Sequence, residues 1–155
     1  MRSDRLRLVG ASPAHVGRIA YRMREIDRIE CGASGRSAKA ALRLALRSSS
    51  WAITALVDGD PHAMFGVAPI SLVQDRGSPW FLGSDETYRY GRALLELGPD
   101  VIARMHASFR RLENTVSTGN GRALRLLSRW GFTIGDAPFE VSGVEFVRFW
   151  RESNV

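Results

Sequence analysis

The strongest local constraint on this sequence is an Asp-Gly dipeptide that separates two apolar runs. Asp58 and Gly59 lie between residues 51–57 and residues 62–67, and both runs are largely apolar. A two-residue hairpin turn needs positive φ at its two central positions, which aspartate and glycine tolerate. The sequence therefore predicts an antiparallel β-hairpin in the middle of the chain, around which the other elements must pack.

Two amphipathic segments precede this hairpin. Ser12 and Pro13 predict a helix start, since serine is a good N-cap and proline is tolerated in the first turn. Apolar residues then recur every three or four positions as far as Ile29, so we expect one helix that ends at the small residues 31–35. A second helix is expected over residues 37–47.

The segments after the hairpin alternate between apolar strands and helices. The pair Gly98-Pro99 interrupts a long helical region, which either kinks there or ends and restarts. In chain order we expect a turn at 76–79, a strand over 79–82, a helical region over 86–109, a strand over 112–116, a helix over 120–130 and strands over 132–134 and 144–150.

Together these elements predict a single α/β (α+β) domain over residues 1–155. The expected architecture is a central mixed, mostly antiparallel sheet of six to seven strands flanked by about four helices. One cysteine, Cys31, and three scattered histidines offer neither a disulfide framework nor zinc spacing, so we expect no bound metal. No apolar run reaches the ~18 residues of a membrane span. We therefore expect a cytoplasmic protein.

The charge of the chain bears on its partners. The net charge is +6, and nearly all the cationic residues are arginines. They are spread along the chain without a basic run or a nucleic-acid-reading motif, so nucleic acid is not the expected partner. Arginine sites for the phosphate groups of a cofactor, or for an acidic partner, are equally consistent with this charge.

A spaced motif in the last third of the chain carries a resemblance to a known superfamily. Asn120 is followed by Ala123 and, eleven residues after the asparagine, by Gly131-Phe132, on a predicted helix that follows a strand. The motif and the order of elements resemble those of the GNAT acyltransferases, the Gcn5-related N-acetyltransferase superfamily. The resemblance implies a GNAT-like fold, acetyl-CoA as cofactor, and a primary amine of a small molecule or a protein as acceptor.

Three further phrases, at residues 55–61, 63–67 and 79–85, are similar to small GNAT-like proteins of tailed bacteriophages, some of which are internal virion proteins. This similarity implies phage or prophage origin, with the host cytoplasm or the virion as location. It also supports an alternative hypothesis, in which the chain is a non-catalytic GNAT-fold protein that serves in the virion or binds a host protein.

The resemblance places the cofactor between the fourth and fifth strands and at the start of the following helix. GNAT enzymes bind the pyrophosphate there with the backbone amides of a Gln/Arg-x-x-Gly-x-Gly/Ala loop. This chain places arginine and glycine two residues apart instead of three, so its arginines act as point charges or are simply solvated. Strand amides at 82–84 are expected to polarise the thioester carbonyl. The implied cofactor-binding residues are Leu82, Gly83, Ser84, Arg89, Gly91, Arg92, Asn120 and Ala123.

The resemblance also directs attention to candidate catalytic residues. The usual general-acid tyrosine, seven residues after the asparagine, is replaced by Leu127, which cannot donate a proton; Ser128 is the neighbouring candidate. Asp85 and Glu86 are candidates for the general base, although they also suit a helix N-terminus. The acceptor amine is expected to lie against carboxylates of the first helix, which are otherwise solvated: Glu25, Asp27 and Glu30.

Overall fold

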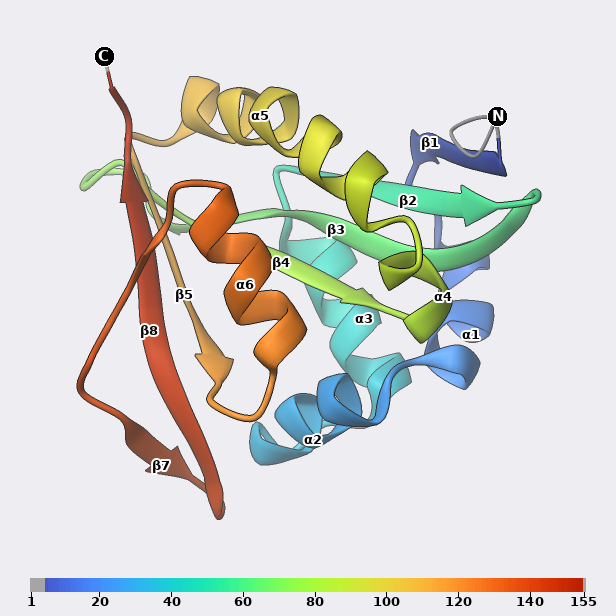
Figure 1. The fold of residues 1–155 in the computed structure, drawn as a ribbon, viewed down its shortest axis with the longest axis horizontal. Helices are drawn as coiled ribbons and strands as arrows, with labels where there is room; N and C mark the ends of the chain where they lie inside the picture. Colours follow the sequence, from blue (N-terminus) through green and yellow to red (C-terminus); the bar gives the residue numbers. More distant parts are fainter. Residues whose placement is uncertain (1–4, 155) are drawn as a thin grey trace.

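The computed structural model describes residues 5–154, which form an eight-stranded sheet and six helices (Figure 1). The predicted α+β class and the mixed, mostly antiparallel sheet are confirmed, with more strands and helices than expected. The strands are β1 (Leu6–Gly10), β2 (Trp51–Val57), β3 (Asp60–Ser71), β4 (Arg76–Gly83), β5 (Arg111–Ser117), β6 (Thr133–Ile134), β7 (Phe139–Val141) and β8 (Val144–Glu152). The helices are α1 (Pro13–Arg22), α2 (Glu25–Ala33), α3 (Ala38–Ser48), α4 (Asp85–Tyr88), α5 (Gly91–Ser108) and α6 (Gly121–Arg129).

The predicted hairpin at Asp58-Gly59 joins β2 and β3. The φ angle is 50° at Asp58 and 84° at Gly59, so both residues adopt the left-handed conformation that a two-residue turn requires. Val57 pairs with Asp60 directly across the turn. The turn thus sets the register of the residues next to it, and an irregularity between Ala55 and Leu56 shifts the pairing along the rest of the two strands.

One pairing in the sheet differs from all the others. Neighbouring strands follow the order β1-β2-β3-β4-β5-β8-β6, with β7 paired to β8. All these pairings are antiparallel except that of β4 with β5, which is parallel. Only Arg76 with Arg111 and Gly77 with Leu112 pair across it. The sheet therefore consists of two antiparallel units joined by a two-residue ladder.

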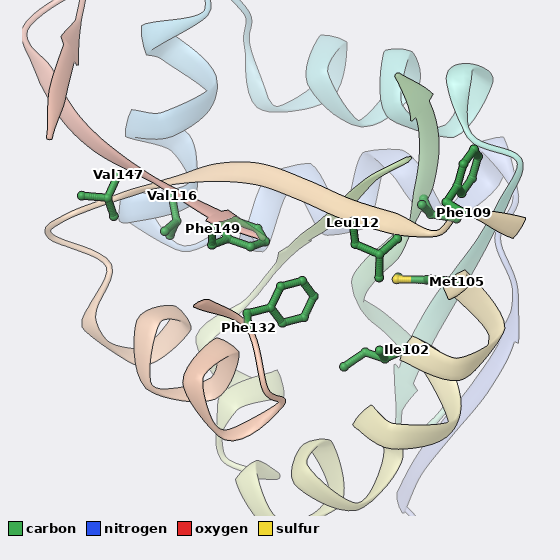
Figure 2. Packing of buried hydrophobic residues seen from close by; sticks show 9 residues of the cluster. Ile102, Met105, Phe109, Leu112, Val116, Phe132, Val147 and Phe149 are labelled. Carbon is green, nitrogen blue, oxygen red and sulfur yellow. The ribbon is translucent and has the colours of Figure 1, made fainter. Parts of the chain in front are cut away.

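Helices cover both faces of the sheet. On one face, α1 and α3 bury Val16, Ile19 and Leu42 together with Met64 of β3. On the other face, α5 and α6 pack over a second cluster, part of which Figure 2 shows. Each fully buried side chain of this size contributes about 1.5–3 kcal/mol. The labelled members of the second cluster are Ile102, Met105, Phe109, Leu112, Val116, Phe132, Val147 and Phe149.

The single first helix that the periodicity predicts is in fact two helices. Met23 and Arg24 have ψ angles of 139° and 146°, which end α1 before α2 begins. The Arg24 N–H donates to the carbonyl of Gly83 (2.9 Å), and the Arg28 guanidinium donates to the carbonyl of Met23 (3.2 Å). Contacts to β4 and to a side chain thus replace the helical hydrogen bonds at the break. The expected helix end at 31–35 lies partly within α2.

The helical region after β4 is also interrupted at a different place than expected. Arg89 and Tyr90 separate α4 from α5, whereas Pro99 lies inside α5. Gly98 has a packing role, because a Cβ atom there would lie 1.9 Å from the indole nitrogen of Trp130. The Gly-Pro pair therefore lets α5 approach the end of α6 closely and does not end the helix.

Two smaller differences concern the strands. Residues 76–79, predicted as a turn, begin β4, and the turn lies at residues 72–75. The three-residue β7 was not predicted, because so short a strand has no clear alternation. Within residues 5–154, no helix combines the length and the apolar character that crossing a bilayer demands.

Candidate functional site

The candidate site lies where β4 and β5 diverge beyond their two-residue ladder (Figure 1). We call the space between residues 78–83 of β4 and residues 113–117 of β5 the strand opening. Pro79 explains why the ladder stops. It has no N–H to donate to β5, and its carbonyl accepts a hydrogen bond from the Asn114 side chain instead (2.7 Å).

A cavity of about 590 Å³ is lined by residues from both faces of the sheet at the strand opening. From one face, Glu30 of α2 and Ala45 of α3 contribute to it. From the other face, Leu94 of α5 and Leu127 of α6 contribute. The volume is within the range of small-molecule sites, and the lining is mostly apolar with a few polar groups, as in such sites.

Carboxylates of α2 bind backbone N–H groups at the ends of both strands. The N–H of Gly83 in β4 donates to Asp27 Oδ2 (3.1 Å), and the N–H of Ser117 in β5 donates to Glu30 Oε2 (3.2 Å). Helix α2 therefore fixes the separation of the two strands at this end of the opening.

The expected carbonyl-polarising amides at 82–84 are mostly occupied. The N–H of Gly83 is bound by Asp27, and the N–H of Ser84 donates to the carbonyl of His62 (2.8 Å). Backbone groups of successive strand residues point to alternate sides, so Phe81 has the same orientation as Pro79 and Gly83. The amide that points into the strand opening is thus that of Phe81, one residue before the predicted set.

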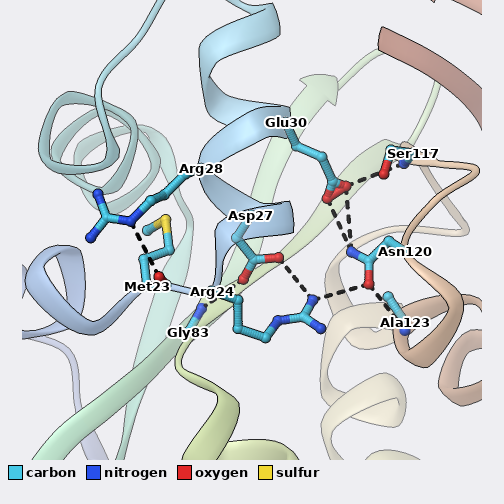
Figure 3. A network of polar contacts seen from close by, with 9 residues as sticks. All are labelled: Met23, Arg24, Asp27, Arg28, Glu30, Gly83, Ser117, Asn120 and Ala123. Atoms are coloured by element: carbon cyan, nitrogen blue, oxygen red, sulfur yellow. Dashed lines mark hydrogen bonds and ion pairs between the residues drawn. The ribbon is translucent and has the colours of Figure 1, made fainter.

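A buried polar network lies between α2 and the start of α6 (Figure 3). Arg24 Nη2 donates to Asp27 Oδ1 (2.9 Å) and to Asn120 Oδ1 (3.0 Å). Asn120 Nδ2 in turn donates to Glu30 Oε1 (3.1 Å). We call these four residues the α2 network. In it, one carboxamide joins a guanidinium on one side to a carboxylate on the other.

The α2 network contains polar atoms whose hydrogen-bonding capacity is not used. Within residues 5–154, Nη2 is the only side-chain nitrogen of Arg24 with a hydrogen bond, and Nε is buried without one. The guanidinium also lies 4.1 Å from the ring centroid of Tyr88. Ser117 Oγ is likewise buried without a partner. Buried polar atoms without partners are rare and costly, so these atoms indicate a place where a ligand would be stabilised.

Burial shifts the pKa of several groups near the strand opening. It raises the pKa of Asp27, although the neighbouring Arg24 acts in the opposite direction. It also raises the pKa of Glu30, which forms no ion pair in the described part of the chain. Burial raises the pKa of Tyr88 to about 12 and that of Cys31 to about 11. Cys31 is therefore a protonated, buried thiol near neutral pH.

A second depression lies on the other face, between the first turns of α5 and helix α6. This groove has a volume of about 750 Å³, and Tyr88 and Leu94 line both it and the cavity. Helix α5 begins at Gly91, and its N-cap residue makes no side-chain capping bond. Free amides at a positive helix end, with arginines opposite, form a favourable environment for phosphate. We call this depression the α5–α6 groove; its arginines are Arg122, Arg125 and Arg129.

The predicted phosphate-binding residues lie beside this groove. Gly91 lines it, while Arg89 and Arg92 are exposed where α5 begins. Arg89 pairs with Glu86 (3.1 Å). The arginines of α6 were not assigned to the site from the sequence. They follow one another at spacings of three and four residues, which places them on one face of the helix, and this is the signal that could have indicated them.

The candidate catalytic residues are not brought together at the strand opening. Asp85 is exposed at the start of α4, and neither Asp85 nor Glu86 lines the cavity. Ser128 is exposed and lines the α5–α6 groove, whereas Leu127 lines the cavity. Glu30 is the ionisable carboxylate that reaches the cavity.

The three carboxylates predicted to face the acceptor have separate positions. Glu30 lines the cavity, Asp27 is buried in the α2 network, and Glu25 is exposed. Arg24 was missed by the sequence analysis. It and Asp27 each follow a buried apolar residue of the first helical segment by four positions. A charged pair on an apolar helix face is therefore the signal that could have revealed the network.

The residues of the Asn-Ala-Gly-Phe motif have local structural roles. Asn120 caps α6, since its Oδ1 accepts a hydrogen bond from the N–H of Ala123 (3.4 Å). Gly131 has a φ of 85°, and Phe132 is buried in the core. In the part of the chain that the structure covers, no group of three or more histidine, cysteine or acidic side chains could hold a metal ion.

Comparison with known proteins supports the fold alone. No family model and no curated protein sequence matches this chain. Solved structures do match it, among them a GCN5-related N-acetyltransferase from Kribbella flavida at 18% identity and a TM-score of 0.71, covering 97% of this chain and 99% of the other. A spermidine N-acetyltransferase chimera of SpeG from Vibrio cholerae and hSSAT has 12% identity and a TM-score of 0.70, covering 96% and 95%. The ribosomal-protein-S5-alanine acetyltransferase from Vibrio fischeri has 11% identity and a TM-score of 0.66, covering 97% and 94%. The chain thus has the GNAT fold.

Proposed function

We propose that this chain binds an acyl-CoA and transfers its acyl group to a primary amine. The observation that carries the proposal is the cavity at the strand opening, which both helical layers line. A groove with three arginines adjoins it on the α5–α6 side, and a carboxylate without an ion pair among the described residues lines it on the α2 side. This arrangement suits a reaction in which an anionic cofactor and an amine approach each other from opposite faces of the sheet.

The residues present fit an acyl-CoA at two places. The Phe81 amide would bind the extended arm of the cofactor in the strand opening. The first amides of α5 and the arginines of the α5–α6 groove would bind its phosphates. When bound, the cofactor supplies an acyl group activated as a thioester.

Glu30 is the residue that we assign as general base. Its raised pKa lets it take a proton from an incoming ammonium more readily than an ordinary carboxylate does. Asp85 and Glu86 lie outside the cavity and are second choices. Leu127 offers no proton to the leaving sulfur. A thiol with a pKa of about 8.5 is a good leaving group near neutral pH without one, so Ser128 is not required.

Calorimetric titration of the purified chain with CoA, acetyl-CoA and pantetheine tests the proposal. We expect CoA and acetyl-CoA to bind with a Kd in the micromolar range, and pantetheine, which lacks the phosphate groups, to bind more weakly. Binding should weaken as salt is raised from 50 to 500 mM, roughly spanning the range over which exposed charges are screened. No binding of CoA at millimolar concentration would contradict the proposal.

A non-catalytic role is the second candidate, and one observation favours it. Asp27 and Glu30 occupy strand N–H groups, and the Asn114 side chain occupies the Pro79 carbonyl, so much of the strand opening is already bonded internally. Such a protein would keep the GNAT fold as a binding scaffold. The similarity to phage proteins, and with it a virion or host-protein partner, remains a prediction from the sequence.

A further inference from the structure

The α2 network carries an unbalanced charge that the fold itself does not explain. Arg24 and Asp27 are paired and nearly fully buried, at 5% and 2% exposure. Glu30 accepts hydrogen bonds only from the Asn120 amide and the Ser117 N–H, and has no cationic partner among residues 5–154. A carboxylate held next to a cavity without a cation favours a cationic ligand.

The Arg24 guanidinium provides the opposite charge. The Nε atom is buried without a hydrogen-bond partner, and the residue Arg24 lines the same cavity as Glu30. A guanidinium with unused N–H groups is suited to a carboxylate, which accepts two hydrogen bonds at once.

Asn120 fixes the spacing of these two groups. Its Oδ1 accepts from Arg24, and its Nδ2 donates to Glu30, so the cation and the anion are held on opposite sides of one carboxamide. The orientation of the amide is determined, because arginine only donates and an ionised carboxylate only accepts. A free α-amino acid has its ammonium and carboxylate on one carbon atom, so one small molecule carries the two groups that complement Glu30 and Arg24.

We propose that the acceptor is a free α-amino acid whose carboxylate binds Arg24 and whose ammonium binds Glu30. This inference rests on the proposed function for the reaction, but the binding itself can be tested separately. Tyr88, Leu82 and Val116 line the cavity beside the network and would contact an apolar side chain of the amino acid.

Four compounds that share a phenyl group and differ in their charged groups test the proposal on the unaltered chain. L-phenylalanine has both groups, L-phenylalaninamide and 2-phenylethylamine lack the carboxylate, and 3-phenylpropionate lacks the ammonium. Calorimetry should show the tightest binding for L-phenylalanine. Loss of either charged group should weaken binding by about 30-fold or more, because it leaves a desolvated partner unpaired. Equal binding of the amine and the amino acid, or no binding of the amino acid, would overturn the proposal.

Substitution of the guanidinium gives a matched test. Arg24→Met keeps an unbranched apolar stem but removes the guanidinium, and it should remove the preference for L-phenylalanine over 2-phenylethylamine. Arg43→Met, at an exposed arginine of α3, should keep that preference. If Arg24→Met does not fold, Arg24→Lys keeps the charge and should retain a reduced preference. A preference that is unchanged in a folded Arg24 variant contradicts the assignment.

The same experiments separate this inference from the proposed function. Titration with CoA is carried out on each variant alongside the amino acid. CoA binding without amino-acid binding would overturn the inference and leave the proposed function in place. Amino-acid binding without CoA binding would support the site and overturn the transferase.

Discussion

The two sides of the strand opening hold their charges in different ways. On the α2 side, Arg24 and Asp27 are buried, and side-chain hydrogen bonds join them to Asn120. On the other side, the arginines of the α5–α6 groove are exposed, and none forms an ion pair with a described residue.

This difference indicates two kinds of recognition in one cavity system. Buried side chains that hydrogen-bond to one another are held in one arrangement, and each depends on its partners. Such groups are suited to selecting a particular small molecule. Exposed arginines act through their summed charge, which salt screens and which tolerates the loss of one member. We therefore expect changes on the α2 side to affect stability and selectivity, and changes in the groove to affect cofactor affinity.

Asn120→Ala should have the largest effect, because it breaks the α2 network at its centre. The variant loses the N-cap of α6 and leaves Arg24 and Glu30 without a shared partner. We expect a loss of about 3 kcal/mol in the free energy of unfolding, measured by urea denaturation. Arg125→Ala, in the groove, should change it by less than about 0.5 kcal/mol. Similar losses in both variants would remove the distinction between the two sides.

Replacing the three groove arginines together should have the next largest effect. The triple change Arg122→Ala, Arg125→Ala and Arg129→Ala should weaken CoA binding by about 10- to 30-fold, or about 1.5–2 kcal/mol, and should flatten its salt dependence. The control is a triple alanine variant with the same change in net charge at exposed arginines that line neither the cavity nor the groove: Arg7, Arg43 and Arg47. An equal loss in the control would mean that net charge alone, and not the groove, attracts the cofactor.

Glu30→Gln tests the burial of charge on the α2 side. Because the folded pKa of Glu30 is raised, the carboxyl adds stability that is fully present below its unfolded pKa and is lost as pH rises through the folded value. Glutamine has no such dependence, so the variant should gain about 1 kcal/mol over the wild type at pH 8, and the gain should shrink towards pH 4. Thermal unfolding over this pH range measures it. A variant that is less stable at pH 8 would show that the ionised carboxylate stabilises the fold.

His62, partly exposed near the start of β3, should give the smallest effect. Its Nε2 must accept from Arg22 Nη1 (2.9 Å), because arginine only donates, so its proton is on Nδ1, beside Ser84 Oγ (2.8 Å). Burial, and then Arg22, lowers the pKa of His62. Its contribution to stability should be present above pH 6.5 and be lost as pH falls through the folded pKa. Solvent screening limits the loss to about 0.5 kcal/mol. His62→Gln should abolish this part of the pH dependence; an unchanged profile would contradict the assignment.

The sequence predicts those parts of the molecule that depend on neighbouring residues. The Asp58-Gly59 turn follows from backbone preferences within a few residues and is found as expected, and the Asn120 cap likewise depends on a hydrogen bond between residues three positions apart. The α2 network could not be predicted in the same way, because Arg24 and Asn120 are 96 positions apart and meet only when the two antiparallel units are assembled. The helix break that places Arg24 in the network depends equally on β4.

The prediction of the strand opening was limited for a related reason. The GNAT resemblance indicates that a gap exists between the fourth and fifth strands, but not which backbone groups remain unbonded in it. The residues that occupy those groups, Asp27 and Glu30, come from a helix far away in the sequence. Phe81 therefore replaces the amides expected at 82–84 for a reason that only the assembled structure provides.

The two-residue ladder between β4 and β5 also has a consequence for how the molecule opens. Two paired positions connect the two antiparallel units across the sheet. We therefore expect this boundary between β4 and β5, the seam, to open more easily than the pairings within either unit. In native-state hydrogen exchange, we expect amides of β2 and β3 to keep their protection when those at the seam have already lost it. Slow separation of β4 from β5, and not the motion of a loop, would then limit the rate at which a ligand enters or leaves the cavity.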